Sequence, residues 1–181
     1  MVAQPMDLVA GDLRLRTLTG QDAALVVAAT AGETGPAFWG PRPVGPYTLA
    51  QARAALRDWS PERGQVSYGM LRGDRMLAVL GLMRDAPDSA ELAYWVRPEE
   101  RGRGLATLGV RLVTGWAHRM GLARIWLEID PGNQASLRVA ARAGYRFERR
   151  LASHCRSWTR DDPATDDWHD CLIWSHVSAT V

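Results

Sequence analysis

The feature that most constrains this fold is the turn Arg101-Gly102-Arg103-Gly104, which joins an apolar run (LAYWV, residues 92–96) to a segment with helical spacing. Gly102 and Gly104 have no side chains, so the backbone there can turn sharply and approach a ligand closely. The first N–H groups of a helix lack intrahelical partners and lie at the positive end of its dipole. Arg101 and Arg103 add positive charge. The turn therefore predicts a strand-to-helix junction that suits a diphosphate.

Two better-known phosphate loops do not fit this turn. The P-loop requires lysine, and the chain has none. The dinucleotide fingerprint Gly-x-Gly-x-x-Gly fails because position 107 is threonine. For these six residues alone, a tight charged connection without a ligand remains an open alternative.

Hydrophobic periodicity predicts a mixed α/β chain. Strands are expected at 13–18, 65–73, 75–84, 90–96, 123–130, 145–155 and 167–177, and helices at 19–30, 49–59, 106–121 and 133–144. This order implies a mixed sheet with helices on both faces. A length of 181 residues fits one domain, which we expect to span residues 1–181.

Composition excludes several classes of function. All 22 basic residues are arginine, and the net charge of +2 is too close to neutral for a nucleic-acid-binding surface. No apolar stretch approaches the ~20 residues that span a bilayer, and the amino terminus does not resemble a secretory signal, so we expect a cytoplasmic protein without a membrane partner. Cys155 and Cys171 are expected to be free thiols, which would become neighbours if their segments pair as strands.

The turn and a second motif together resemble the GNAT superfamily of acyl-CoA-dependent N-acyltransferases. Residues 101–106, RGRGLA, match its signature Gln/Arg-x-x-Gly-x-Gly/Ala, and NQASLRVAARAGYRFE (133–148) is similar to a pattern of the ribosomal-protein N-terminal acetyltransferase branch. The resemblance implies a mostly antiparallel sheet of about six to seven strands, with two parallel central strands that splay apart. It also implies acetyl-CoA as cosubstrate and a primary amine as acceptor.

The resemblance further assigns residues to coenzyme A. The pyrophosphate would bind the N–H groups of residues 102–106, pantetheine would run along the backbone of residues 94–96, and Asn133 would contact pantetheine as well as cap a helix. A backbone N–H near Val96 would stabilise the oxyanion. The cofactor-binding set is Tyr94, Trp95, Val96, Arg101, Gly102, Arg103, Gly104, Leu105, Ala106, Asn133 and Ser136.

Three catalytic candidates follow. Ser136, one turn after Asn133, is the candidate proton donor to the departing thiolate, because many relatives use a tyrosine where this chain has Ala140. Glu91 and Glu128 are the candidate bases that deprotonate the amine; Glu148 ranks third, and a water relay is the alternative.

Other polar residues have weaker assignments. Trp39 is the candidate substrate contact, and Glu99 and Glu100 are expected to form a solvated lip of the turn. Arg138 and Arg142 are either solvated or bound to the adenosine 3′-phosphate. His154, Cys155, His169 and Cys171 show no metal-ligand spacing, so no metal is expected.

The expected function is therefore acetyl transfer from acetyl-CoA to a protein or peptide amino terminus, by direct attack and without an acyl-enzyme. A small-molecule amine such as an antibiotic or polyamine is the alternative acceptor, and a non-catalytic acyl-CoA-binding module is the alternative class. A monomer and a homodimer are both compatible with the sequence.

Overall fold

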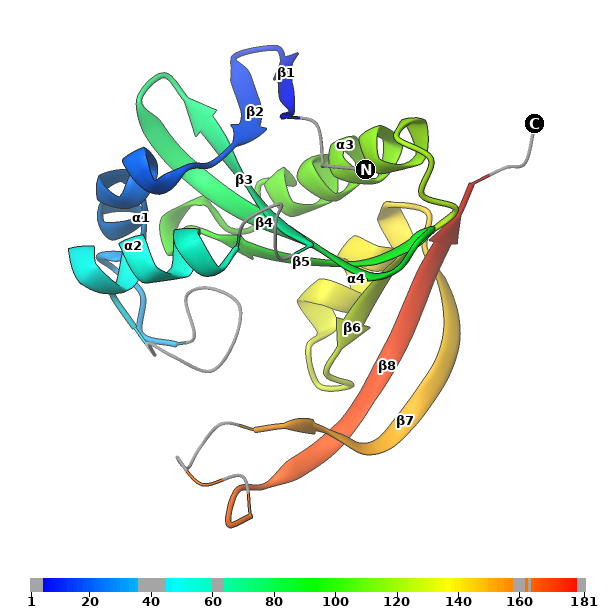
Figure 1. Ribbon diagram of the computed structural model, residues 1–181. Helices are drawn as coiled ribbons and strands as arrows, with labels where there is room; N and C mark the ends of the chain where they lie inside the picture. Colours follow the sequence, from blue (N-terminus) through cyan, green and yellow to red (C-terminus); the bar gives the residue numbers. More distant parts are fainter. Residues whose placement is uncertain (1–4, 36–44, 60–63, 158–161, 163, 179–181) are drawn as a thin grey trace.

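The computed structural model describes residues 5–35, 45–59, 64–157, 162 and 164–178. The described residues build an eight-stranded sheet in the order β1-β2-β3-β4-β5-β6-β8-β7, with the last two strands forming a long hairpin (Figure 1). The strands are β1 (Asp7–Ala10), β2 (Leu13–Thr17), β3 (Gln65–Arg72), β4 (Arg75–Ala86), β5 (Ser89–Val96), β6 (Arg124–Ile129), β7 (Arg146–Arg156) and β8 (Trp168–Val177). The sequence pattern predicted seven of these strands and missed the four-residue strand β1.

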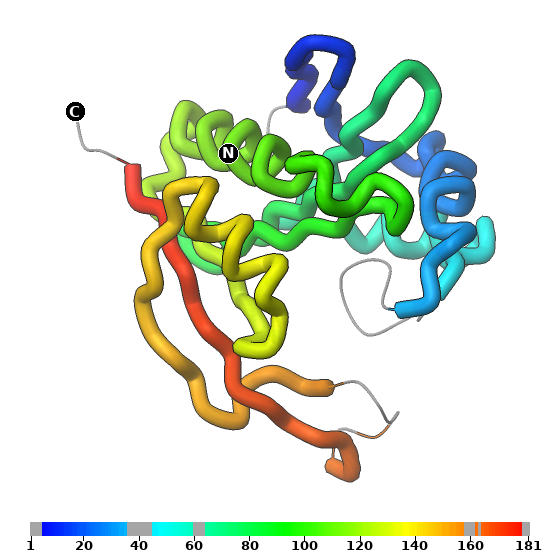
Figure 2. Tube along the Cα trace, turned by 180° about the vertical axis from the view of Figure 1, so that it is seen from behind, coloured from blue at the N-terminus to red at the C-terminus, as the bar shows by residue number. Residues whose placement is uncertain are grey.

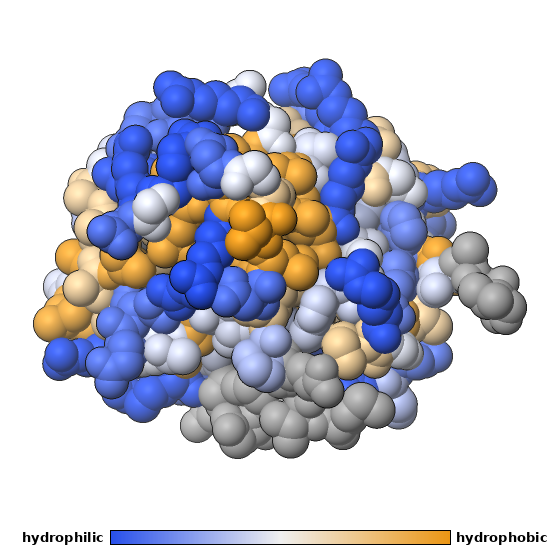
Figure 3. Space-filling model, turned by 90° about the horizontal axis from the view of Figure 1, so that it is seen from above, coloured by the Kyte–Doolittle hydropathy of each residue, from blue (hydrophilic) through white to orange (hydrophobic). Residues whose placement is uncertain are grey.

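Helices cover both faces of the sheet, as the sequence predicts. They are η1 (Gly20–Asp22), α1 (Ala23–Thr30), α2 (Leu49–Asp58), η3 (Pro98–Glu100), α3 (Leu105–Arg119) and α4 (Gln134–Arg142). One core lies between the sheet and α3 and α4, and a second core packs α1 and α2 against the other face. From behind, α3 and α4 lie side by side on the near face (Figure 2). Seen from above, an apolar area bordered by hydrophilic side chains lies at the end where α3 and the β1–β2 hairpin are found (Figure 3).

Local sequence explains where the elements begin and end. The Thr19 side chain accepts a hydrogen bond from the Gln21 backbone, and Thr48 and Gln51 form a capping box that begins α2. Gly121, with φ of 89°, follows α3 in the left-handed conformation that glycine adopts without strain. None of the helices in the described part of the chain combines the length and apolar character needed to cross a bilayer.

The central strands β5 and β6 are parallel, and they pair over a short distance. Their register is Ser89 with Arg124, Ala90 with Ile125, and Glu91 with Trp126. Beyond Glu91, β5 continues to Val96 and β6 to Ile129 without pairing to each other. This arrangement confirms the predicted pair of splayed parallel strands.

The expectation of free thiols is wrong for this structure. Residues 151–156 and 168–172 pair as antiparallel strands, and Cys155 and Cys171 form a disulfide between β7 and β8. The sequence separates the two cysteines by 16 positions, and only the strand pairing makes them neighbours.

Candidate active site

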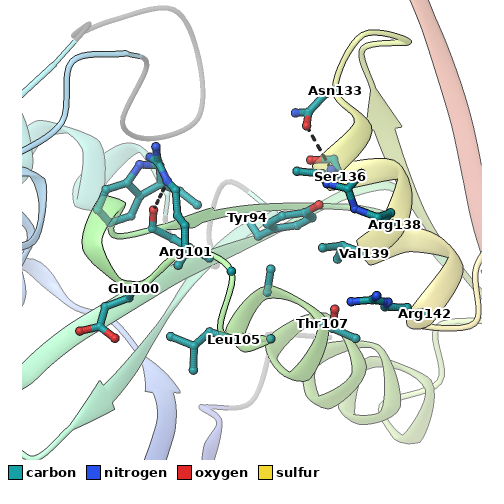
Figure 4. A pocket seen from close by; sticks show the side chains of 16 residues that line it. Tyr94, Glu100, Arg101, Leu105, Thr107, Asn133, Ser136, Arg138, Val139 and Arg142 are labelled. Atoms are coloured by element: carbon teal, nitrogen blue, oxygen red, sulfur yellow. Dashed lines mark hydrogen bonds between the residues drawn. The ribbon is translucent and has the colours of Figure 1, made fainter.

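A pocket of about 450 Å³ opens between the end of β5, the 100–107 turn and α4 (Figure 4). It is lined by Tyr94, Trp95, Val96, Glu100, Arg101, Gly102, Gly104, Leu105, Ala106, Thr107, Asn133, Ala135, Ser136, Arg138, Val139 and Arg142. The structure thus brings together every residue predicted to bind the cofactor except Arg103. Trp39 lies outside the described residues.

The glycine turn has the conformation that its sequence predicts. Gly102 and Gly104 have φ of 77° and 80°, in the left-handed region that favours glycine. Gly104 is the N-cap of α3 and offers no side chain to the first free N–H groups of the helix. No heavy atom lies within 4 Å of the position that a Cβ would take on either glycine. The backbone here is therefore open to an anionic ligand.

The turn arginines have protein partners. Arg101 donates from Nε to the carbonyl of Val96 (3.0 Å), and its guanidinium pairs with Glu33. Arg103 pairs with Glu100 at 3.1 Å. These contacts tie the turn to its surroundings, so their first role is to hold its shape.

Glu100 is buried, which corrects the expectation that it forms part of a solvated lip. Its side chain is 3% exposed and pairs with Arg75 at 2.8 Å as well as with Arg103. A carboxylate can lie beside the turn because two guanidinium groups neutralise it. Glu99 remains half exposed, as expected.

Two arginines of α4 bring positive charge to the pocket. Arg138 and Arg142 both line the pocket, and Arg142 extends toward α3 in Figure 4. Neither arginine belongs to an ion pair within the part of the chain that the structure describes. Both arginines therefore lie where the ligand-binding alternative requires them to be.

Asn133 and Ser136 begin α4. The Asn133 side-chain oxygen accepts a hydrogen bond from the Ser136 backbone N–H at 3.0 Å, which confirms the predicted cap. Both residues line the pocket. Ala140 is fully buried and belongs to the core cluster, so a tyrosine at this position would require the core around it to rearrange.

The phenol of Tyr94 was missed as a functional group because the sequence assigned this residue through its backbone alone. Its hydroxyl oxygen is buried, makes no hydrogen bond of ordinary geometry with the described residues, and points across the pocket toward α4, which carries Ser136 (Figure 4). Burial raises the pKa of Tyr94, while the adjacent Ser136 side chain acts in the opposite direction. Tyr94 and Ser136 therefore place two protonated hydroxyls side by side.

The candidate bases lie on the other face of the sheet. Burial, followed by the negative charges of Glu128 and Asp85, raises the pKa of Glu91 to about 7. Glu128 lies near His154 and Cys155, and Asp85 accepts a hydrogen bond from the Trp126 indole at 3.1 Å. Glu148 instead pairs with Arg124 at 2.7 Å, which lowers its pKa and makes it a weaker base than Glu91.

A phosphate-suited turn and a pocket at a splayed parallel strand pair together define a coenzyme A-dependent acyltransferase. Residues 12–146 match the family model described as Acetyltransferase (GNAT) domain. The chain therefore belongs to the GNAT acetyltransferase family, as the sequence motifs predict.

Relatives and solved structures agree with this assignment. The probable N-acetyltransferase YjcK of Bacillus subtilis (strain 168) is 34% identical over 79 residues, which are 41% of this chain and 44% of that protein. The structure of RimL, a ribosomal L7/L12 alpha-N-protein acetyltransferase in complex with coenzyme A, superposes with a TM-score of 0.77 at 18% identity, over 96% of this chain and 98% of that one. A mutant of the spermidine N-acetyltransferase SpeG from Vibrio cholerae gives a TM-score of 0.72 at 14% identity, over 93% of this chain and 95% of that one. At these identities, the structural likeness establishes the fold.

Proposed function

We propose that residues 1–181 act as one domain that transfers an acetyl group from acetyl-CoA to the amino terminus of a protein or peptide. The observation that carries this proposal is that β5 and β6 stop pairing after Glu91 and Trp126, which leaves an opening between the two strands. A pocket suited to a nucleotide thioester lies on one face of this opening, and a carboxylate with a pKa of about 7 lies on the other.

The pocket residues fit coenzyme A. The N–H groups at the start of α3 and the open space at Gly102 and Gly104 suit a pyrophosphate, and Arg138 and Arg142 suit the adenosine 3′-phosphate. The unpaired backbone of Tyr94 to Val96 on its β6 side suits an extended pantetheine. Acetyl-CoA supplies the thioester, and the other parts of the proposal concern side chains of this chain.

Glu91 is the proposed base. An incoming amine is protonated near neutral pH and becomes nucleophilic only after it loses a proton. A carboxylate with a pKa of about 7 is partly ionised at that pH and is basic enough to accept the proton. Glu128, with its contacts to His154 and Cys155, supports the Glu91 pKa through its charge.

Ser136 and Tyr94 are the proposed donors to the thiolate. The two hydroxyls are neighbours in the pocket, and the Tyr94 hydroxyl makes no hydrogen bond of ordinary geometry within the described part of the chain. An unsatisfied buried hydroxyl is costly, and a ligand atom that accepts its proton would remove the cost. The pair would replace the tyrosine that is absent at position 140.

Two acceptor classes are distinguished by different observations. The fold likeness to RimL supports a protein amino terminus. The three carboxylates Asp85, Glu91 and Glu128 on one side of the opening favour a cation, so a polyamine is the second candidate.

Thiol release from acetyl-CoA tests the proposal. The panel should contain peptides with free amino-terminal Ala or Ser, the same peptides with blocked amino termini, and spermidine. We expect turnover with the free peptides and none with the blocked ones. Faster turnover with spermidine than with the peptides would identify a polyamine as the acceptor. Coenzyme A binding without turnover on any amine would indicate a non-catalytic binding module.

A further inference from the structure

Three metal-binding side chains meet on one face of the β7–β8 hairpin. Cys155 lies opposite His169 in the strand register, and Cys171 is two positions from His169 along β8. One ligand atom from each residue lies within 4.8 Å of the others. Tetrahedral zinc with Zn–S of about 2.3 Å and Zn–N of about 2.0 Å needs donor separations of roughly 3.5–3.8 Å. The two sulfurs, which are bonded to each other here, would therefore have to move apart after reduction, and side-chain rotation can provide this movement.

An irregularity in β7 creates this arrangement. Between Leu151 and Cys155 the register shifts: β7 advances four residues while β8 advances two. Ser153 within the bulge has a φ of 48°, and its N–H donates to Asp170 at 2.9 Å. Bulges redirect side chains, and this one places Cys155 across from His169. No spacing rule in the sequence reveals the cluster because it depends on the bulge.

A carboxylate lies against the same sulfur. Cys155 Sγ is 2.7 Å from Glu128 Oε1. A disulfide sulfur carries no proton, so its lone pairs would repel a carboxylate oxygen at this distance. The contact is favourable only when a proton or a cation lies between the two atoms. The geometry around Glu128 therefore suits the reduced pair.

His169 is oriented as metal-binding histidines are. Its Nε2 lies 3.2 Å from Asp130 Oδ2, the carboxylate contact that commonly fixes such a ring while the other nitrogen binds the metal. That other nitrogen, Nδ1, is 3.1 Å from Ser157 Oγ. Binding through Nδ1 requires the serine hydroxyl to give up this contact.

We propose that the reduced chain binds one Zn²⁺ through Cys155, His169 and Cys171, with the Glu128 carboxylate turning in from its contact with Cys155 as the fourth ligand. A thiol reductant breaks the S–S bond and is itself oxidised, which leaves two thiols; each releases a proton to solvent when its sulfur binds the metal. The disulfide form offers no thiolate and does not bind. Soft sulfur ligands with imidazole select zinc over magnesium or calcium. The metal would fasten the hairpin to β6 through Glu128.

Cobalt and zinc titrations of the reduced chain, without oxygen, test this site. Co²⁺ should give the intense visible bands of a tetrahedral site together with sulfur-to-cobalt charge transfer, and added Zn²⁺ should remove both at about one equivalent. His169→Asn and Cys171→Ser should lower zinc affinity at least ~10-fold. His154→Asn is the matched control, because His154 also lies near Glu128, at 3.7 Å, but is not one of the three ligands.

A second measurement keeps the test independent of variant folding. Zinc should protect Cys155 of the reduced wild type from alkylation, as read by mass spectrometry; Cys171 is buried and is shielded with or without metal. An unprotected Cys155, or cobalt spectra without sulfur charge transfer, would overturn the proposal. Neither readout uses acetyl transfer, so failure here leaves the proposed activity untouched.

Discussion

Glu33 and Trp95, 62 positions apart in sequence, share a buried hydrogen bond of 2.7 Å from the indole Nε1 to the carboxylate. The same carboxylate pairs with Arg101 and accepts from the backbone N–H groups of Thr34 and Gly35. One side chain thus connects the segment after α1 to β5 and to the glycine turn. The motif search did not find Glu33 because no local pattern distinguishes it from a surface glutamate.

Glu33→Gln should lower the free energy of unfolding at pH 7 by about 1–3 kcal/mol, because an amide cannot replace all of these contacts. Burial opposes ionisation, yet the hydrogen bonds from Gly35, Trp95 and Thr34 and the charge of Arg101 lower the pKa of Glu33. The contribution is therefore present above the ordinary pKa of 4.5 and is lost as pH falls through the lowered value. Denaturant unfolding of the wild type and the variant across pH measures this contribution. Equal pH dependence in the wild type and the Glu33 variant would contradict it.

Gly104→Ala and Gly121→Ala form a matched pair at opposite ends of α3. Both glycines have positive φ and open space at Cβ, so each variant should lose about 1–2 kcal/mol of stability. Only Gly104→Ala should weaken coenzyme A binding, and Gly104→Glu should nearly abolish it through bulk and charge. Calorimetric titration decides the matter: a folded Gly104→Glu protein with wild-type affinity is incompatible with the proposed pyrophosphate site.

Glu91→Gln should reduce kcat by ~10²-fold or more and leave acetyl-CoA affinity intact. In the wild type, kcat/KM should rise with pH through about 7, since the ionised carboxylate is the active form. Glu128→Gln removes a negative charge that raises the Glu91 pKa, so this rise should move to lower pH. An unmoved profile in both variants would assign the base to a water relay.

Folding stability gives a second test of the Glu91 pKa. Because the folded-state value lies above the ordinary 4.5, the wild type should lose stability as pH rises from 4.5 to about 7. Glu91→Gln should abolish this loss, which amounts to at most about 3 kcal/mol. Identical pH curves for the two proteins would argue against the raised value.

Tyr94→Phe should slow acetyl transfer at least ~10-fold, while the free energy of unfolding changes by less than about 1 kcal/mol. The small stability effect follows because the deleted hydroxyl makes no hydrogen bond of ordinary geometry with the residues that the structure describes. Ser136→Ala should act in the same direction, and the double variant should be less than additive if the two hydroxyls serve one proton. Wild-type rates in both single variants would show that neither hydroxyl donates the proton to the departing thiolate, which would then come from solvent.

Arg138→Ala and Arg142→Ala should weaken coenzyme A binding more than binding of its 3′-dephospho form. The reason is that both guanidiniums line the pocket without ion-pair partners among the described residues. Comparing the two ligands on each variant isolates the 3′-phosphate. An equal loss for both ligands would place these arginines elsewhere on the cofactor.

The sequence predicted the elements well where a periodic pattern or a special residue determines them. The glycine turn, the Asn133 cap and the splayed parallel pair were all predicted. Contacts between segments that are distant in sequence were not predicted. The burial of Glu100, for example, depends on its ion pair with Arg75 at the start of β4. The position of the Tyr94 hydroxyl depends likewise on how α4 packs over β5.

The disulfide is a second feature that the sequence did not predict, because it also depends on which residues the strand pairing brings together. Spacing and compartment argued for free thiols, while strand register decides which cysteines meet. The bulge at Ser153 sets that register, and a positive φ at a serine has no sequence signature comparable to that of glycine.

The three-residue ladder between β5 and β6 has a mechanical consequence. It is the direct hydrogen-bonded seam between the first five strands and the last three. Because only three residue pairs join β5 to β6, we expect these strands to separate more often in local opening than the longer strand pairs of the sheet. An extended ligand seated along Tyr94 to Val96 would lengthen the seam, so amide exchange in β5 and β6 should slow when coenzyme A is present.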